Sequence, residues 1–169
     1  MNATSRQIPP QERLIIALDL PTADKARELV VQLGDAGHFY KIGLELFMSP
    51  NFFTLLDWLR AQHKKVFVDL KFFDIPETVG RAMKSLDERC DDCCTVHGHK
   101  AIMEVAAKAK EGKVKVLAVT ALTSLDQGGL TDLGFQCDVA ELVLSRARRA
   151  LAAGCDGVVS SGLEVGKLK

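Results

Sequence analysis

Short apolar runs alternate with segments of helical periodicity along almost the whole chain, and this alternation restricts the possible folds more than any other feature. Strands that alternate with helices form a parallel sheet, either open or closed into a barrel. The predicted strands are residues 14–18, 39–42, 66–71, 94–97, 114–119 and a run that starts at Val158. The predicted helices cover residues 26–33, 52–59, 76–86, 102–109 and 139–151, and a loop with Gly128 and Gly129 precedes the last of them.

Polar side chains stand at the ends of most of these strands. In parallel α/β proteins the carboxyl ends of the strands form the rim where active sites lie. A polar group from each of several strands on one rim is therefore a stronger signal than any one motif. The residues are Asp19, Lys41, Asp69, Lys71, Asp74, His97, Thr120, Thr123, Ser124, Ser160 and Ser161.

The segment 68–78, VDLKFFDIPET, is the densest of these strand ends. Side chains alternate between the two faces of a strand, so Asp69 and Lys71 are predicted to share one face. An acid and a base on one face at a strand end are seldom needed for packing but often needed for chemistry. Pro76 is suited to the first position of the next helix.

Each of these residues also has a purely structural interpretation. Asp74 can cap the helix at Pro76, with Glu77 completing a capping box. His97 can hydrogen-bond a neighbouring loop, and Thr123 can belong to a turn. Asp69 and Lys71 can form a buried ion pair, although such pairs recover their desolvation cost poorly.

Composition limits the class of protein and its partners. The chain has 169 residues, of which 47% are hydrophobic, enough for a single domain over 1–169, and residues 1–12 are predicted to be a flexible N-terminal segment. The 22 basic and 22 acidic residues balance, which argues against nucleic acid and anionic membranes as partners. No signal peptide or membrane-length apolar run is visible, so a cytoplasmic location is expected.

The chain has five cysteines. Because disulfides are rare in cytoplasmic proteins, they are interpreted as free thiols in the core. Cys90, Cys93 and Cys94 precede His97 and His99, which leaves a zinc site as an alternative. Structural zinc sites usually pair a CxxC with distant ligands in a small fold, and here Cys93 enters a predicted strand. No metal is therefore expected.

The segment 69–78, DLKFFDIPET, resembles the DxKxxDIPxT signature of the orotidine 5′-phosphate decarboxylase family. Four other segments resemble the family's strand ends in the same order: IALD at 16–19, YKIG at 40–43, TVH at 95–97 and VTALTS at 119–124. The resemblance implies a (β/α)8 TIM barrel that works as a homodimer without a cofactor. It also implies the decarboxylation of orotidine 5′-monophosphate to uridine 5′-monophosphate in pyrimidine synthesis.

The resemblance further assigns roles to residues. Lys41, Asp69, Lys71 and Asp74 would form a charged array around the reacting carboxylate, with Lys71 as the proton donor and Asp74 reaching into the site of the neighbouring subunit. Asp19, Lys41 and Asp74 would hold ribose hydroxyls, and Thr123 would lie near the pyrimidine. The substrate-binding residues implied in this way are Asp19, Lys41, Asp69, Lys71, Phe72, Phe73, Asp74, Ile75, Pro76, Thr78 and Thr123.

The pattern yields six strands, whereas the barrel has eight. The family's phosphate-binding motifs belong to the seventh and eighth strands and are not found here, so the 169 residues alone are expected to have little activity. Three alternatives stay open. They are an inactive truncated product, a magnesium-dependent sugar-phosphate decarboxylase of the same superfamily, and a doubly wound nucleotide-binding domain. The last lacks a GxGxxG or P-loop after its first strand.

Overall fold

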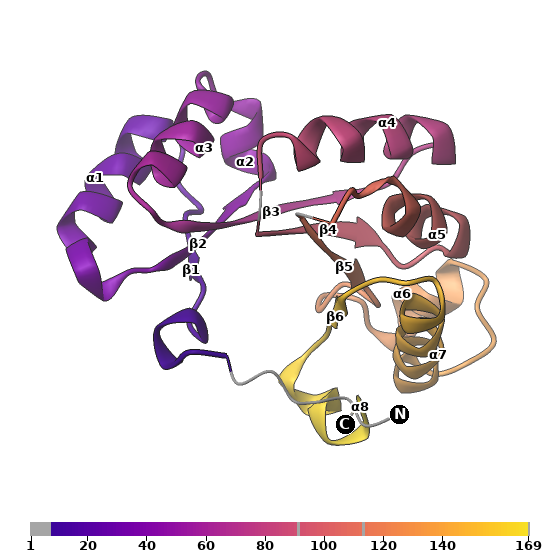
Figure 1. Cartoon of the computed structure of the whole chain (residues 1–169). Coiled ribbons are helices and arrows are strands. Elements are labelled where there is room, and N and C mark those ends of the chain that lie inside the picture. The colour runs from indigo at the N-terminus through magenta and orange to yellow at the C-terminus, as the bar shows by residue number, and fades with distance from the viewer. Residues whose placement is uncertain (1–7, 91, 113, 169) are drawn as a thin grey trace. The chain divides into compact units, whose positions relative to one another are not determined.

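The computed structural model describes residues 8–90, 92–112 and 114–168. The chain divides into two compact units, Met1–Asp69 and Leu70–Lys169, with strand β3 crossing from one to the other (Figure 1). Each unit consists of parallel strands linked by helices, and in the described residues the strands number six, as the sequence predicts.

The first unit contains three parallel strands in the order of the chain, with Tyr40 opposite Ile16 on one side and Val66 on the other. Its elements are η1 (Pro10–Glu12), β1 (Ile16–Ala17), α1 (Ala23–Leu33), η2 (Gly34–Ala36), β2 (Phe39–Gly43), α2 (Leu44–Met48), α3 (Phe52–Ala61) and β3 (Lys65–Phe72). The short helix α2 was not predicted, because a single turn is too short to show helical periodicity.

Local sequence explains where these elements start and how they pack. The hydroxyl of Thr22 accepts a hydrogen bond from the Lys25 amide and caps α1, as predicted. Tyr40 is fully buried in the core, and a side chain at Gly37 would collide with its hydroxyl group. Glycine at position 37 is therefore required for the tyrosine to fit.

The second unit also contains parallel strands in chain order, with β5 between β4 and β6. Its elements are α4 (Pro76–Asp87), β4 (Cys93–His97), α5 (Lys100–Ala109), β5 (Lys115–Val119), α6 (Gln127–Asp132), α7 (Val139–Ala152), β6 (Gly157–Val159), η3 (Gly162–Glu164) and α8 (Val165–Leu168). The sequence predicted a loop around Gly128 and Gly129, but these glycines lie in α6, whose start is capped by the Asp126 side chain through the Gly129 amide.

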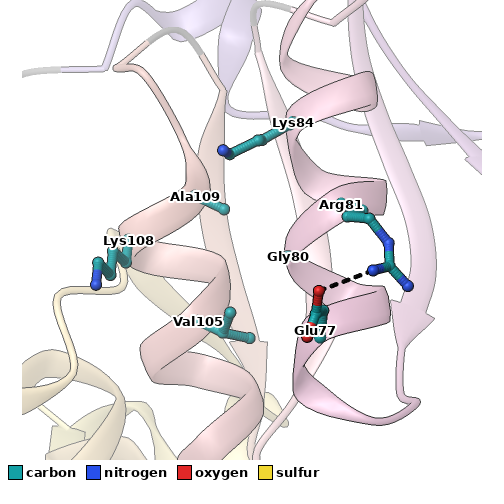
Figure 2. A pocket seen from close by; sticks show the side chains of 7 residues that line it. All are labelled: Glu77, Gly80, Arg81, Lys84, Val105, Lys108 and Ala109. Carbon is teal, nitrogen blue, oxygen red and sulfur yellow. Dashed lines mark hydrogen bonds and ion pairs between the residues drawn. The ribbon is translucent and has the colours of Figure 1, made fainter.

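Helices α4 and α5 lie side by side, and their contact depends on one glycine (Figure 2). A methyl group at Gly80 would lie 3.0 Å from Val105 Cγ2, which is tighter than ordinary van der Waals contact. Along this contact runs a shallow pocket lined by Arg81, Lys84 and Lys108, in which Glu77 pairs with Arg81 at 2.9 Å.

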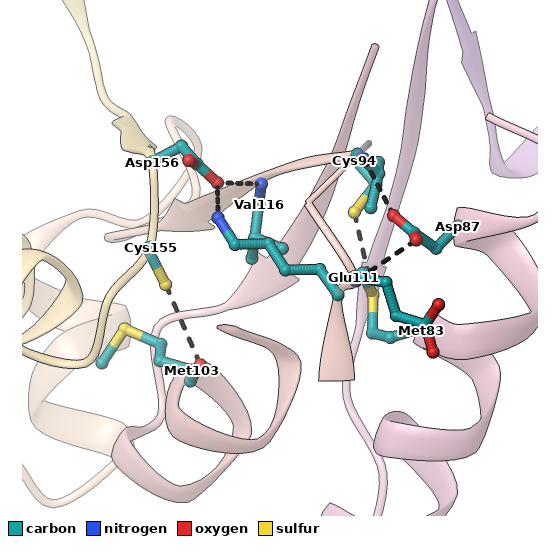
Figure 3. Close-up of polar contacts among 10 residues, drawn as sticks. Met83, Asp87, Cys94, Met103, Glu111, Val116, Cys155 and Asp156 are labelled. Carbon is teal, nitrogen blue, oxygen red and sulfur yellow. Dashed lines mark hydrogen bonds and ion pairs between the residues drawn. The ribbon is translucent and has the colours of Figure 1, made fainter. Parts of the chain in front are cut away.

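Four of the five cysteines are buried in the core of the second unit, whereas Cys137 is half-buried. Figure 3 shows two of the buried thiols, Cys94 and Cys155. Cys94 lies 3.7 Å from the sulfur of Met83, and Cys155 lies 4.0 Å from the Met103 carbonyl. Burial raises the pKa of Cys94, and burial raises that of Cys155 to about 11. These thiols are therefore unreactive core residues, as the sequence analysis expected.

Candidate functional site

Three charged side chains meet at the carboxyl ends of the strands of the first unit. Lys41 Nζ lies 2.9 Å from Asp19 Oδ1 and 3.7 Å from Asp69 Oδ2. The strand register brings them together, because Ala17 lies opposite Lys41 and Gly43 lies opposite Asp69. The Asp69 and Lys41 side chains are 14% and 22% exposed, whereas Asp19 is 63% exposed. The predicted convergence of strand ends is thus confirmed for these three residues.

Lys71 has a backbone conformation that the sequence did not predict. Its φ angle is +49°, in the left-handed region that is unfavourable for residues with a side chain. The alternation of side chains along an extended strand, from which Asp69 and Lys71 were predicted to share one face, therefore does not apply at Lys71. The Lys71 amide donates a hydrogen bond of 2.9 Å to Oγ1 of Thr95, which is fully buried in β4.

The residues after Lys71 are mostly exposed. Phe73 and Ile75 are 64% and 66% exposed, although both are large apolar side chains, and Asp74 is exposed as well. Phe72 and Thr78 are half-buried.

The predicted capping box at the start of α4 is not formed. Ile75 occupies the N-cap position without a side-chain cap, and Pro76 is the first helical residue, as predicted. The Asp74 carboxylate instead accepts a hydrogen bond of 2.6 Å from the adjacent Ile75 amide. Asp74 therefore shapes the turn before the helix and does not satisfy the amides of its first turn.

The His97 ring stacks on Phe73, with 4.2 Å between ring centroids and 29° between the ring planes. Its Nδ1 atom is buried and has no hydrogen-bond partner in the described part of the chain. Burial lowers the pKa of His97, and the positive charge of Arg146 and the neighbouring His99 lower it further. A hydrogen bond to a neighbouring loop was one interpretation of His97 from the sequence, but the contact that the structure shows is with an aromatic ring.

A mostly apolar pocket of about 240 Å³ lies next to these residues in the second unit. Arg146 on α7 lies at its edge, donating a 2.7 Å hydrogen bond to the Thr120 carbonyl and lying over the Phe135 ring. Neither Arg146 nor Phe135 was predicted from the sequence, because neither stands at the end of a strand. The pocket is lined by Lys71, Phe73, His97, Val119, Ala121, Leu122, Leu125, Leu133, Phe135, Leu142 and Arg146.

The remaining polar strand ends have mainly local roles. Thr123 and Ser124 lie in a turn closed by the Leu125 amide and the Leu122 carbonyl, 2.9 Å apart, and Thr123 is exposed. Ser161 caps η3 through the Leu163 amide. Thr123 does not line the pocket, so its predicted place near a pyrimidine stays a prediction.

Neither a metal centre nor a membrane helix is found in the part of the chain that the structure describes. Within residues 8–90, 92–112 and 114–168, no three side chains of His, Cys, Asp or Glu are grouped to hold a metal ion. The helices of the same residues are all too short or too polar to cross a bilayer.

Comparison with known proteins gives a consistent family assignment. The model of the orotidine 5′-phosphate decarboxylase / HUMPS family matches residues 12–169. An orotidine 5′-phosphate decarboxylase of Methylococcus capsulatus is 68% identical over 166 residues, which cover 98% of this chain and 68% of that protein. One of Xanthomonas campestris is 45% identical over 170 residues and is matched over 70% of its length.

The fold agrees with this assignment. The crystal structure of orotidine 5′-phosphate decarboxylase from Lactobacillus acidophilus superimposes with a TM-score of 0.85 at 34% identity, covering 92% of this chain and 74% of that one. The fold is therefore that of a (β/α)8 TIM barrel, of which the described residues contribute six strands. The chain belongs to the orotidine 5′-phosphate decarboxylase / HUMPS family.

Proposed function

We propose that the protein decarboxylates orotidine 5′-monophosphate to uridine 5′-monophosphate in pyrimidine synthesis, without a cofactor. The observation that carries the proposal is the cluster in which Lys41 lies between the Asp19 and Asp69 carboxylates, at 2.9 and 3.7 Å. The signature lysine, Lys71, follows Asp69 by two positions and lines a mostly apolar pocket.

The reaction breaks the bond between C6 of the pyrimidine and its carboxylate. The electron pair of that bond stays on C6, carbon dioxide leaves, and the Lys71 ammonium gives its proton to C6. A fixed cation stabilises such a carbanion more strongly in an apolar pocket than in water, because water screens the charge. Lys71 recovers its proton from solvent after each turnover.

The other signature residues are proposed to hold the nucleotide. Asp19, Lys41 and Asp74 would bind ribose hydroxyls, and Asp69 would face the substrate carboxylate. Thr123 would lie near the ring, and Phe72, Phe73, Ile75, Pro76 and Thr78 would complete the nucleotide site. Asp74 is exposed, which suits its proposed place in the site of a second subunit, and the protein would act as a cytoplasmic homodimer.

The magnesium-dependent alternative is less compatible with the charges of the site. Magnesium is bound in proteins mainly through carboxylate oxygens. Here β2 supplies Lys41, and its ammonium already contacts both carboxylates of the cluster. A cation in this place suits direct binding of an anionic substrate.

The experiment is a spectrophotometric assay of orotidine 5′-monophosphate consumption by the purified protein, with and without EDTA, together with titration of uridine 5′-monophosphate. For the protein with all eight strands of the barrel, we expect turnover that EDTA leaves unchanged and measurable binding of the product. Activity that EDTA abolishes and magnesium restores would favour the alternative. Absence of both turnover and nucleotide binding in the eight-stranded protein would refute the proposed function.

A further inference from the structure

The described contacts of the signature segment with β4 follow a regular pattern. Thr95 and His97 are two residues apart on β4 and so share one face of the strand. Their contacts, Lys71 and Phe73, are also two residues apart. Thr95 binds the Lys71 amide at 2.9 Å, and His97 stacks on the Phe73 ring at 4.2 Å.

The β4 side of this contact is part of the paired sheet. Thr95 is fully buried, and β4 is hydrogen-bonded in register to β5, with His97 opposite Val119. A methyl group at the next residue, Gly98, would lie only 2.5 Å from the Val119 carbonyl oxygen. The chain directly after His97 therefore passes so close to β5 that only glycine fits at position 98.

The signature side of the contact needs outside support. Lys71 has an unfavourable φ of +49°, and Phe73 is 64% exposed although it is a large apolar side chain. Backbone strain of this kind persists only where the surroundings impose it. The contacts with Thr95 and His97 act on these two residues.

The charge state of His97 suits stacking. Burial lowers the pKa of His97, the charges of Arg146 and His99 lower it further, and Lys71 lines the same pocket. The ring is therefore neutral at neutral pH. A neutral imidazole stacks on Phe73 without bringing a further positive charge close to the Lys71 ammonium.

We propose that Thr95 and His97 are positioning residues, which hold the Lys71 backbone and the Phe73 ring and thereby fix the place of the Lys71 ammonium. We call these two contacts, Thr95 with the Lys71 amide and His97 with the Phe73 ring, the clamp. Its effect on the reaction rests on the proposed function, but its existence does not. Neither residue needs to touch the substrate.

Amide hydrogen exchange of residues 71–75 tests the clamp without any substrate. His97→Ala should raise exchange in this segment roughly fivefold to tenfold, since a stacked ring pair is lost, and His97→Phe should restore protection. Thr95→Val, nearly isosteric, should speed exchange of the Lys71 amide, and Thr95→Ser should not. Phe73→Leu removes the same stack from its exposed side, so it repeats the test without disturbing the core.

His99→Ala is the matched control, because the His99 ring lies farther from Phe73, at 6.3 Å and tilted by 47°. Its effect on exchange should be much smaller than that of His97→Ala. Two results would overturn the clamp. One is unchanged exchange in His97→Ala, Phe73→Leu and Thr95→Val, and the other is an equal effect of the two histidine variants.

Kinetics then separate positioning from general stability. His97→Ala should lower kcat roughly fivefold to tenfold while KM changes less than about twofold, and His97→Phe should recover most of kcat. Altered exchange in the variants, together with no turnover by the eight-stranded wild-type protein, would refute the proposed function and leave the clamp standing. Altered exchange with unchanged kcat would show that the clamp does not position Lys71 for the reaction.

Discussion

The two ends of the strands in the second unit differ in how their polar groups are satisfied. At the amino-terminal end, Asp87 accepts hydrogen bonds from the amides of Val114 and Glu111, at 2.9 and 3.2 Å (Figure 3). Asp156 accepts one from the Val116 amide at 2.8 Å and pairs with Lys110. At the carboxyl end, Lys71 has a φ of +49°, and Nδ1 of His97 is buried without a partner in the described residues.

The two ends therefore differ in role: the amino-terminal end contributes stability, and the carboxyl end carries the proposed chemistry. A buried carboxylate that receives two amides stabilises the loop that donates them. Strained backbone and unpaired polar atoms lower stability and persist chiefly at functional sites. The division matches the barrel fold, in which the carboxyl ends of the strands carry the active site and the opposite ends serve stability.

The largest effect is expected for Lys71→Ala. The change removes the proposed proton donor, so kcat should fall at least about a thousandfold, while the melting temperature changes little because Lys71 is exposed. Steady-state kinetics and a thermal melt measure the two quantities. Lys84→Ala is the control and should keep normal turnover. Lys84 is an exposed lysine that lines the shallow pocket between α4 and α5. Turnover within tenfold of wild type in Lys71→Ala would remove this residue from the mechanism.

Asp87→Ala should have the opposite profile. Asp87 is 4% exposed, and its loss leaves the buried Val114 amide without an acceptor, which should cost about 2–3 kcal/mol of unfolding free energy. Turnover per folded molecule should stay normal. Urea unfolding gives the loss, and Asp87→Asn, which keeps one acceptor, should lose less. A loss of turnover matching that of Lys71→Ala would break the distinction between the two ends.

A pair of variants at Lys71 tests the backbone strain itself. Glycine accepts positive φ without a steric penalty, so Lys71→Gly should be about 1 kcal/mol more stable than Lys71→Ala, although both lack the ammonium. Chemical denaturation of the two variants under the same conditions gives the difference. If the alanine variant were equally stable, the φ angle at this position would carry no strain.

The smallest expected effect is a dependence of stability on pH. The pKa of His97 is lowered in the folded protein, so the unfolded chain takes up the proton first as the pH falls below about 6.5. Above pH ~6.5, the ordinary histidine pKa, the neutral ring contributes its full share of the stability. As the pH falls from there to the lower pKa of the folded protein, this contribution is lost. His97→Phe should therefore show a shallower fall in melting temperature on acidification. If the melting temperature fell equally steeply with pH in both proteins, His97 would not be the cause of the pH dependence.

The sequence predicted the arrangement of the elements well, because their signals are local. The predicted strand 66–71 agrees with β3 (Lys65–Phe72), and Pro76 correctly marked the start of α4. The cluster of Asp19, Lys41 and Asp69 followed from strand ends meeting at one edge. Helix α6 was missed because its two glycines resemble a loop, whereas Asp126 caps it.

What the sequence could not predict depends on contacts between distant residues. The left-handed Lys71 was missed because a strand pattern assumes extended backbone. The stack of His97 on Phe73 joins residues 24 positions apart and has no periodic signature. Arg146 was missed because it lies within α7 and reaches the pocket through a side chain bound to the Thr120 carbonyl.

The most direct test of the central claim is hydrogen exchange at C6 of uridine 5′-monophosphate in D₂O. If the Lys71 ammonium protonates C6, the reverse step requires the Lys71 amine to remove that proton, so the bound product should exchange it with solvent. We predict deuterium at C6 with the wild-type protein and none above background with Lys71→Ala at saturating nucleotide. Equal incorporation by both proteins would contradict the assignment of Lys71 as proton donor.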